Sequence, residues 1–411
     1  MLLLYNVGIR LYALLISLSS LFNKKARLFR AGRRHIWQNL TEFRKENGSN
    51  LSWFHAASLG EFEQGLPVME AFKATFPNQL IVISFFSPSG YEQRKNHPVA
   101  DFTCYLPLDT RRNAQRFLNI LKPDQAFFIK YEYWYHYLNQ INTRSIPLYS
   151  LSALFTPEHI FFKKHGVLHR KMLKLFTHTF VQNSKSRLLL ESIGIDEVTV
   201  SGDTRFDRVK QTVSSPDSFS NIESFCKNSK VLILGSVWPE DMEVVADFIN
   251  QNTPELKIII APHLIDAAHI QKIIRKIQLP YCLYSQGEIS MDKPILILDT
   301  IGMLSSVYQY GDLAYIGGAF GDGLHNILEA VAFGLPVVFG NKGLEKFPEA
   351  DELITLGGAF SVDNSHMAGE VLENLMIDDF RKGASDICVN YVNEHTGATN
   401  TIMSYLKSHI K

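Results

Sequence analysis

The stretch LAYIGGAFGDGLHNILEAVAFGLPVVFG, residues 313–340, decides the fold class that we predict for this chain. It begins with the short apolar run Leu313 to Ile316 and continues through a glycine-rich loop into a longer apolar segment. It ends with a second short run, Pro336 to Phe339. A strand, a loop, a helix and a second strand in this order form a βαβ unit with parallel strands. The stretch therefore predicts an α/β architecture.

The same alternation extends along most of the chain and predicts parallel sheets covered by helices. In the first half, the candidate strands are Leu51 to His55, Leu80 to Phe86, Gln125 to Ile129, Ile146 to Leu151, Thr179 to Gln182 and Val198 to Ser201. After a polar linker at Ser214 to Ser218, the further candidates are Lys230 to Leu234, Leu256 to Ala261, Pro294 to Leu298 and the two runs above. We expect two Rossmann-like domains that face a cleft, with ligands at the carboxyl ends of the strands.

Composition narrows the classes of function. A chain of 411 residues, 46% of them hydrophobic, is longer than one hydrophobic core usually supports, which favours two domains. Its 41 basic and 41 acidic residues cancel, so its net charge gives no reason to expect a nucleic-acid partner. The four cysteines are far apart, which indicates a reducing compartment and buried thiols rather than a disulfide framework or a zinc site.

The N-terminus has the pattern of a membrane anchor. Leu2 to Phe22 is largely apolar, and a basic flank without acidic residues follows, made of Lys24, Lys25, Arg27, Arg30, Arg33 and Arg34. About 20 apolar residues can span a bilayer, and basic residues hold their flank in the cytoplasm. Arg10 weakens a spanning helix, because a charge near its centre costs about 3 kcal/mol. A helix lying in the membrane interface and a helix packed on its own domain are the alternatives.

Two loops of the second half are candidate nucleotide sites. Gly235 and Ser236 follow a candidate strand and precede a helix start at Pro239, where free backbone N–H groups can bind a phosphate. The glycine-rich loop 317–323 permits close backbone approach to a ligand, and Glu329 on the helix behind it can accept both ribose hydroxyls. The simpler alternatives are an ordinary strand-to-helix turn and a carboxylate that complements a helix N-terminus.

Two segments of the first half are candidate acceptor sites. Glu61 lies at the start of the helix that follows the first strand, where it could act as a general base. Its alternative is a helix-capping carboxylate. Lys130 to Trp134 follows another strand and combines charged and aromatic side chains suited to sugar contacts, or forms an ordinary solvated turn.

In order and approximate spacing, several segments resemble the 3-deoxy-manno-octulosonic acid (Kdo) transferases of lipopolysaccharide synthesis, inverting glycosyltransferases with the GT-B fold. The segments are HAASLGE at 55–61, KYEYW at 130–134, SGDTRFD at 201–207, GSVW at 235–238, DTIGML at 299–304 and the glycine-rich stretch 317–340. The resemblance implies Glu61 as the general base, CMP-Kdo as the donor and a lipid A precursor as the acceptor. It implies no metal and no cofactor.

The resemblance also implies two sets of binding residues. The acceptor-side set is Ser58, Gly60, Lys130, Glu132 and Arg205. The donor-nucleotide set is Gly235, Ser236, His263, Ile301, Gly302, Gly318, Asn326 and Glu329. Three positions depart from the family: Pro262 stands where an arginine precedes His263, Arg205 replaces a lysine, and KYE replaces an ETE-like segment, so only Glu132 carries over there.

The prediction as a whole is an enzyme on the cytoplasmic face of the bacterial inner membrane. It divides the chain into a membrane anchor with its basic flank (1–34), an acceptor-binding domain (35–213) and a CMP-sugar-binding domain (214–411) whose last helix packs back on the first domain. The alternatives are another GT-B enzyme that uses a UDP-sugar on a lipid acceptor, and a non-catalytic protein of the membrane surface.

Overall fold

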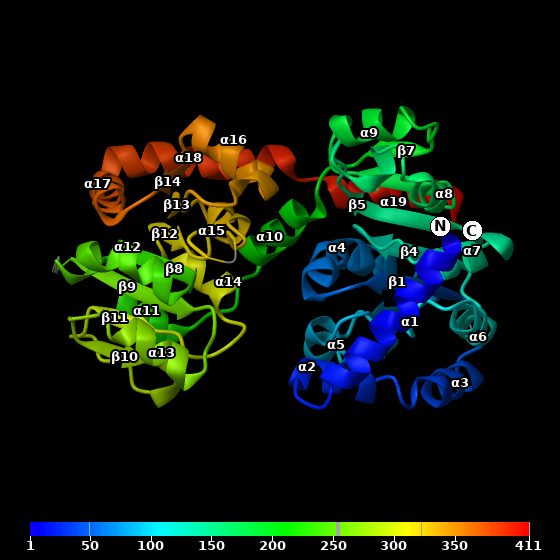
Figure 1. Cartoon of the computed structure of the whole chain (residues 1–411). Coiled ribbons are helices and arrows are strands. Elements are labelled where there is room, and N and C mark those ends of the chain that lie inside the picture. The colour runs from blue at the N-terminus through cyan, green and yellow to red at the C-terminus, as the bar shows by residue number, and fades with distance from the viewer. Residues whose placement is uncertain (49, 252–254, 322, 411) are drawn as a thin grey trace. The chain divides into compact units, whose positions relative to one another are not determined.

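The computed structural model describes residues 1–48, 50–251, 255–321 and 323–410. These residues form two compact units (Figure 1). Unit 1 comprises Met1–Arg208 together with Gly397–Lys411, and unit 2 comprises Val209–Thr396. Each unit is built on one seven-stranded parallel sheet, so the predicted α/β class with two Rossmann-like sheets, as in GT-B proteins, is confirmed.

The sheet of unit 1 has the strand order β3-β2-β1-β4-β5-β6-β7. Its strands are β1 (Leu51–Ala56), β2 (Leu80–Phe85), β3 (Phe102–Tyr105), β4 (Gln125–Ile129), β5 (Leu148–Ala153), β6 (His178–Val181) and β7 (Val198–Val200). Its helices are α1 (Leu2–Ser19), α2 (Lys24–Ala31), α3 (Ile36–Glu46), α4 (Leu59–Thr75), α5 (Pro88–Arg94), α6 (Arg111–Leu121), α7 (Tyr135–Thr143), the 3₁₀ helix η1 (Ile160–Phe162), α8 (Val167–Leu173), α9 (Ser184–Glu191) and α19 (Ala398–His409).

The sheet of unit 2 has the order β10-β11-β9-β8-β12-β13-β14. Its strands are β8 (Lys230–Val237), β9 (Leu256–Pro262), β10 (Tyr281–Leu283), β11 (Ile295–Ile297), β12 (Leu313–Ile316), β13 (Val337–Gly340) and β14 (Ala359–Val362). Its helices are α11 (Ser220–Cys226), α12 (Pro239–Asn250), α13 (Ala267–Ile274), η2 (Tyr284–Gln286), α14 (Leu304–Val307), η3 (Tyr308–Tyr310), α15 (Leu328–Ala332), η4 (Leu344–Lys346), α16 (Pro348–Leu356), α17 (Ser365–Met376) and α18 (Asp378–His395). Helix α10 (Thr204–Ser214) crosses the boundary between the units.

The central strands are continuously apolar because both faces of each sheet are covered. Every residue of β1 and β4 is buried. Side chains such as Trp53 and Phe128 pack on one face of the unit 1 sheet, while Phe54 and Phe127 pack on the other. The second of these cores also includes Ile402 of α19, so the end of the chain completes the core of unit 1.

The N-terminal helix α1 lies against unit 1 instead of standing apart from it (Figure 1). The Tyr5 hydroxyl donates to Asp109 at 2.5 Å, and Asn6 Oδ1 is 2.6 Å from His136 Nε2. The Tyr12 ring stacks on that of Phe86, with 6.0 Å between centroids. The helix is long and apolar enough to cross a membrane, which is weak support for membrane association. One face of α1 is bound to unit 1 at these points. In this structure α1 is therefore a helix packed on its own domain and not a separate membrane-spanning segment.

One residue of the predicted basic flank has a structural role. Arg33 donates to three backbone carbonyls, those of Phe29 at 2.8 Å, Phe86 at 2.7 Å and Leu106 at 2.9 Å. Its guanidinium also lies 3.5 Å from the centroid of the Phe29 ring. Burial lowers the pKa of Arg33 to about 10, so it remains charged at neutral pH. Arg33 therefore ties the segment after α2 to the ends of β2 and β3.

Candidate active site

Both sheets place the predicted site loops at their topological switch points. In unit 1 the strand order reverses between β1 and β4, and in unit 2 it reverses between β8 and β12. Ligands in open α/β sheets bind beyond the carboxyl ends of the strands at such points. The HAASLGE segment starts with the last two residues of β1, and KYEYW follows β4. GSVW covers the end of β8 and the residue after it, and the glycine-rich loop follows β12.

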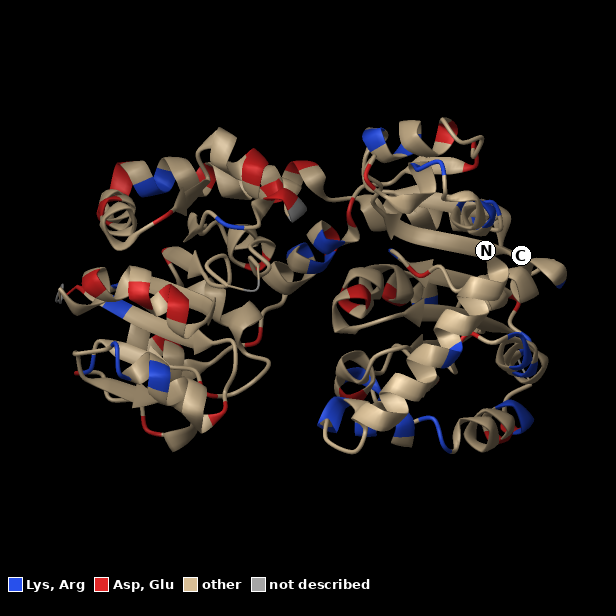
Figure 2. Cartoon of the chain, in the orientation of Figure 1, with Lys and Arg blue, Asp and Glu red and all other residues tan. Residues whose placement is uncertain are grey.

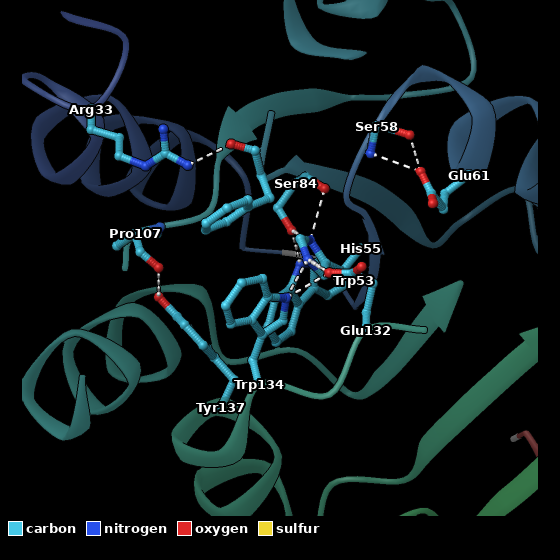
Figure 3. A network of polar contacts seen from close by, with 11 residues as sticks. Arg33, Trp53, His55, Ser58, Glu61, Ser84, Pro107, Glu132, Trp134 and Tyr137 are labelled. Carbon is cyan, nitrogen blue, oxygen red and sulfur yellow. Dashed lines mark hydrogen bonds and ion pairs between the residues drawn. The ribbon is translucent and has the colours of Figure 1, made fainter. Parts of the chain in front are cut away.

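A buried hydrogen-bond network occupies the switch point of unit 1 (Figure 3). His55 Nε2 lies 3.0 Å from Glu132 Oε2, and His55 Nδ1 lies 2.8 Å from Ser84 Oγ. Trp134 Nε1 donates to the same Glu132 oxygen at 2.6 Å, and Trp53 Nε1 donates to Ser84 Oγ at 2.8 Å. His55 is fully buried and Glu132 is 9% exposed. A buried polar group without a partner is costly, so the network fixes the Glu132 carboxylate in place.

Glu61 forms a separate group with Ser58 at the start of α4. Its Oε2 accepts from the Ser58 backbone N–H at 3.0 Å and from the Ser58 hydroxyl. This is the capping-box arrangement, in which a glutamate in the first turn satisfies a free N–H at the helix start. Within the described residues, no hydrogen bond is made by Glu61 Oε1, and none joins Glu61 to the His55 network. One carboxylate oxygen thus caps the helix while the other is available to a ligand.

The SGDTRFD segment lies beside α4. Gln64 Nε2 donates to Asp203 Oδ1 at 2.9 Å, and Arg205 Nε donates to Asp203 Oδ2 at 2.8 Å. The pKa of Tyr131 is raised to about 12, mainly by burial, and the positive charge of Arg205 nearby opposes part of this increase. Lys130 has φ +64, an uncommon conformation for a residue other than glycine, and its ammonium is 5.3 Å from the Tyr131 ring centroid. The structure therefore brings the 130–132 segment and Arg205 into one region of unit 1.

We expected Gly235 and Ser236 to form a loop in unit 2. The structure instead places both residues within β8. The register of β8 with β9 shifts between Leu234 and Val237, and Ser236 takes a φ of +53 at this irregularity. A side chain at 235 would place its Cβ 2.0 Å from Tyr308 Oη, so packing alone requires the glycine there. Strained residues of this kind cluster at ligand sites. Helix α12 begins only at Pro239.

Asp241 joins the start of α12 to the glycine-rich loop. Its Oδ2 accepts from the backbone N–H groups of Trp238 at 2.8 Å and Gly318 at 2.9 Å. Burial raises its pKa above the ordinary value, although these hydrogen bonds oppose the shift. A Cβ at Gly317 would lie 2.6 Å from the same carboxylate, and Gly318 has φ +101, so both glycines are required by the backbone path. Asp322 of this loop is outside the described residues.

Three aromatic rings stack beside this loop. The ring centroids of Trp238 and His263 are 4.5 Å apart, and those of His263 and His325 are 4.3 Å apart with 12° between the planes. Trp238 Nε1 lies 3.1 Å from His325 Nε2. Because the indole N–H can only donate, His325 Nε2 is the acceptor in this contact. The stack places His263 between two rings at the carboxyl end of β9.

The remaining predicted residues of unit 2 form two smaller groups. Asn326 Nδ2 donates to Glu329 Oε1 at 3.0 Å, so these two residues are adjacent. Helix α15 starts at Leu328, which leaves His325 and Asn326 in the loop rather than on the helix. Ile301 is 75% exposed and Gly302 has φ +94 with open space around it, so this part of the DTIGML segment is a projecting turn.

Several residues at these sites were not predicted to have a role. They are His55 and Ser84 in unit 1 and Asp241 and Trp238 in unit 2. The available signals were a histidine at the end of an apolar strand and an aspartate in the first turn of a helix. Among the described residues, no cluster of three or more His, Cys, Asp or Glu residues is arranged to hold a metal ion.

Two parallel Rossmann-like sheets with loops gathered at both switch points define a GT-B-like α/β protein. UDP-GlcNAc 2-epimerase from Neisseria meningitidis shares this fold, with a TM-score of 0.62 and 15% identity over 87% of this chain and 99% of that one. Residues 32–208 match the family described as 3-deoxy-D-manno-octulosonic-acid transferase (kdotransferase). The chain belongs to the Kdo transferase family and is a glycosyltransferase.

Curated relatives extend this similarity to most of the chain. The 3-deoxy-D-manno-octulosonic acid transferase of Chlamydophila psittaci is 25% identical over 329 residues, which are 77% of this chain and 75% of the relative. That of Chlamydia trachomatis is 25% identical over 374 residues, 88% of this chain and 86% of the relative. The expected family and enzyme class are thus confirmed.

Proposed function

We propose that this protein transfers Kdo from CMP-Kdo to a lipid A precursor, with inversion at the anomeric carbon, at the cytoplasmic face of the inner membrane. The observation that carries the proposal is the family match over residues 32–208, which includes Glu61, Glu132 and Arg205. Family membership favours the donor and acceptor. The exposed apolar residues of α1 favour the membrane location.

Glu61 is the proposed general base. Each candidate carboxylate has its Oε2 in hydrogen bonds, Glu132 to His55 and Trp134 and Glu61 to Ser58. They differ in burial, since Glu132 is 9% exposed whereas Glu61 is only half-buried and so more accessible to an acceptor hydroxyl. Glu61 removes the proton from the acceptor hydroxyl as that oxygen attacks the anomeric carbon, and the CMP phosphate leaves from the opposite face. The bond to the acceptor oxygen forms as the bond to the phosphate oxygen breaks, which inverts the configuration.

Unit 2 is the proposed nucleotide-binding part. Asn326 and Glu329 hold the ribose hydroxyls, and the Ile301–Gly302 turn contacts the base. Backbone N–H groups near Gly235, Ser236 and Gly318 stabilise the phosphate, together with His263 in place of the family's arginine. Fixed donors directed at a growing negative charge are the main source of rate enhancement in such sites. On the acceptor side, Ser58, Gly60, Lys130 and Arg205 contact sugar.

A turnover assay tests the proposal. The purified protein is incubated in detergent with a lipid A precursor and one donor. Parallel reactions contain CMP-Kdo, UDP-N-acetylglucosamine or UDP-glucose, and the products are identified by mass spectrometry. We expect a mass increase of one or more Kdo residues with CMP-Kdo alone. A sugar transferred only from a UDP donor, or no transfer from any donor by folded protein, contradicts the proposal. NMR of the product determines the anomeric configuration.

A further inference from the structure

A cavity of about 580 Å³ lies between α1 and the start of α6. Three arginines line it, Arg10 from α1 and Arg111 and Arg112 from α6, together with Asn6 and His136. Figure 2 shows basic segments on α1 and α6 on this side of unit 1. The three arginines are exposed and make no hydrogen bond or ion pair with any described residue. The cavity is large enough for a lipid headgroup.

The position of two of these arginines is electrostatically unfavourable without a ligand. Arg111 and Arg112 occupy the first turn of α6, which contains no acidic residue, and so they lie at the positive end of the helix dipole. The one carboxylate lining the cavity, Asp109, already accepts hydrogen bonds from Tyr5 Oη at 2.5 Å and from two backbone N–H groups at 3.0 Å. Asp109 forms no ion pair with these arginines in the described residues, and a bound anion would compensate both charges and the helix end.

Helix α1 carries an apolar ridge on a face other than the one that lines the cavity. The exposed side chains of α1 recur with the spacing of one helix face and are 53–75% exposed: Leu3, Leu4, Val7, Leu11, Leu14, Leu15 and Leu18. The opposite face of α1 carries Tyr5 and Asn6, which bind unit 1. A helix with one face docked on its domain and an unpartnered leucine ridge on the other suits the lipid side of a membrane interface.

We propose that this cavity binds the phosphomonoester of an anionic membrane lipid while α1 lies in the plane of the membrane surface. The ridge enters the acyl boundary, and the three cations meet a phosphate at headgroup depth. Arginine suits this role because its planar donors bind phosphate oxygens in pairs. The inference rests on the proposed membrane location, and it adds a specific headgroup site to it.

Vesicle binding tests the inference without any turnover. The full chain is mixed with phosphatidylcholine vesicles containing either phosphatidic acid, a phosphomonoester, or phosphatidylserine, at matched total negative charge, and bound protein is measured by co-sedimentation. We expect tighter binding to phosphatidic acid. In the double variant Arg111→Gln/Arg112→Gln, affinity for phosphatidic acid vesicles should fall about 25-fold, about fivefold per cation, and the preference should disappear.

Three further arms decide between explanations. The control Lys171→Gln/Lys185→Gln removes two exposed cations of unit 1 outside the cavity and should retain the preference. An equal loss in this control, or a preference that survives in the arginine variant, overturns the inference. The inference is also overturned if inorganic phosphate, measured by calorimetry, binds as tightly as the vesicles, because the site would then recognise free phosphate and not a lipid. The variant Leu11→Ser/Leu15→Ser should bind every vesicle more weakly. If its binding is unchanged, the proposed membrane location is wrong, while the preference for phosphatidic acid still tests the headgroup site separately.

Discussion

Glu61 and Glu132 show how two carboxylates near one switch point acquire different roles. Glu132 is buried and bonded through Oε2 to His55 and Trp134, whereas Glu61 is half-buried and bonded through Oε2 to Ser58 at the helix start. Both roles considered for Glu61, cap and base, are compatible in this geometry. The structure confirms the capping contact, and the catalytic role stays a prediction.

Replacing Glu61 tests the catalytic role. Glu61→Gln retains a side chain that can still accept the capping hydrogen bond, so the melting temperature should change little. The amide cannot take up the proton, and single-turnover transfer should slow at least about 10²-fold. CMP binding, measured by calorimetry, should be unchanged. Glu223→Gln, an exposed glutamate in the first turn of α11, is the control and should transfer at the wild-type rate. A Glu61→Gln protein with more than a tenth of the wild-type rate rules out this base.

Replacing Glu132 tests the buried network. Glu132→Ala removes the carboxylate that binds both His55 Nε2 and Trp134 Nε1 and leaves them only their 3.2 Å contact with each other. Losing hydrogen bonds to a buried charged group should cost about 1–3 kcal/mol of unfolding free energy. Urea unfolding measures the loss. The control is Glu197→Ala, since Glu197 also faces a histidine, His178 at 3.5 Å, but is 76% exposed at its side chain. That change should cost less than about 1 kcal/mol, and equal losses would show the network to be unimportant for stability.

The sequence predicted the segments that form these sites but not the residues that contact them. The switch-point segments could be found because short motifs at strand ends are local features of sequence. The partners could not, because His55 meets Ser84 and Glu132, and Asp241 meets Gly318, only after distant strands are paired. The expected phosphate loop at Gly235 and Ser236 proved to be part of a strand for the same reason: pairing with β9 extends β8 to Val237.

At the scale of elements, the strands missed by the sequence share one property. β3, β10 and β14 are the unpredicted strands, and each lies at an edge of its sheet. Edge strands pair on one side only and are short, so their sequences lack the continuous apolar run of a central strand. The runs beginning at Leu51, Gln125 and Leu313 were predicted because they form central strands that are buried on both faces.

Helix α19 should contribute to the stability of unit 1. Ile402 is fully buried in the same core as Phe54 and Phe127 of the central strands. Ile402→Ala should lower the unfolding free energy by about 2–5 kcal/mol, because it removes buried methyl groups and leaves a cavity. Asn400→Ala changes an exposed position of the same helix and should cost less than about 0.5 kcal/mol. Similar unfolding midpoints in urea for the two variants would mean that α19 is dispensable for the core.

For the whole molecule, acid should destabilise unit 1 well above the range in which carboxylates titrate. Burial lowers the pKa of five of its histidines, His97, His136, His159, His169 and His178. The unfolded chain then binds more protons than the folded one below about pH 6.5, so stability falls as pH falls. Burial raises the pKa of Asp109 above its ordinary value near 3.8. The folded chain therefore takes up this proton more readily than the unfolded chain, so this group alone would make stability rise as pH falls. The melting temperature, followed by circular dichroism, should decrease from pH 7.5 to 5.5, and a constant or rising value contradicts this assignment.

The return of the chain to unit 1 at Gly397 has a consequence for biosynthesis. The core that receives Ile402, Met403 and Leu406 cannot be completed when the first 208 residues leave the ribosome. Roughly 190 further residues must be added first, a delay of about 10–40 s at about 5–20 residues per second. The N-terminal part of the nascent chain must therefore wait, with part of its apolar surface uncovered, until translation is nearly finished.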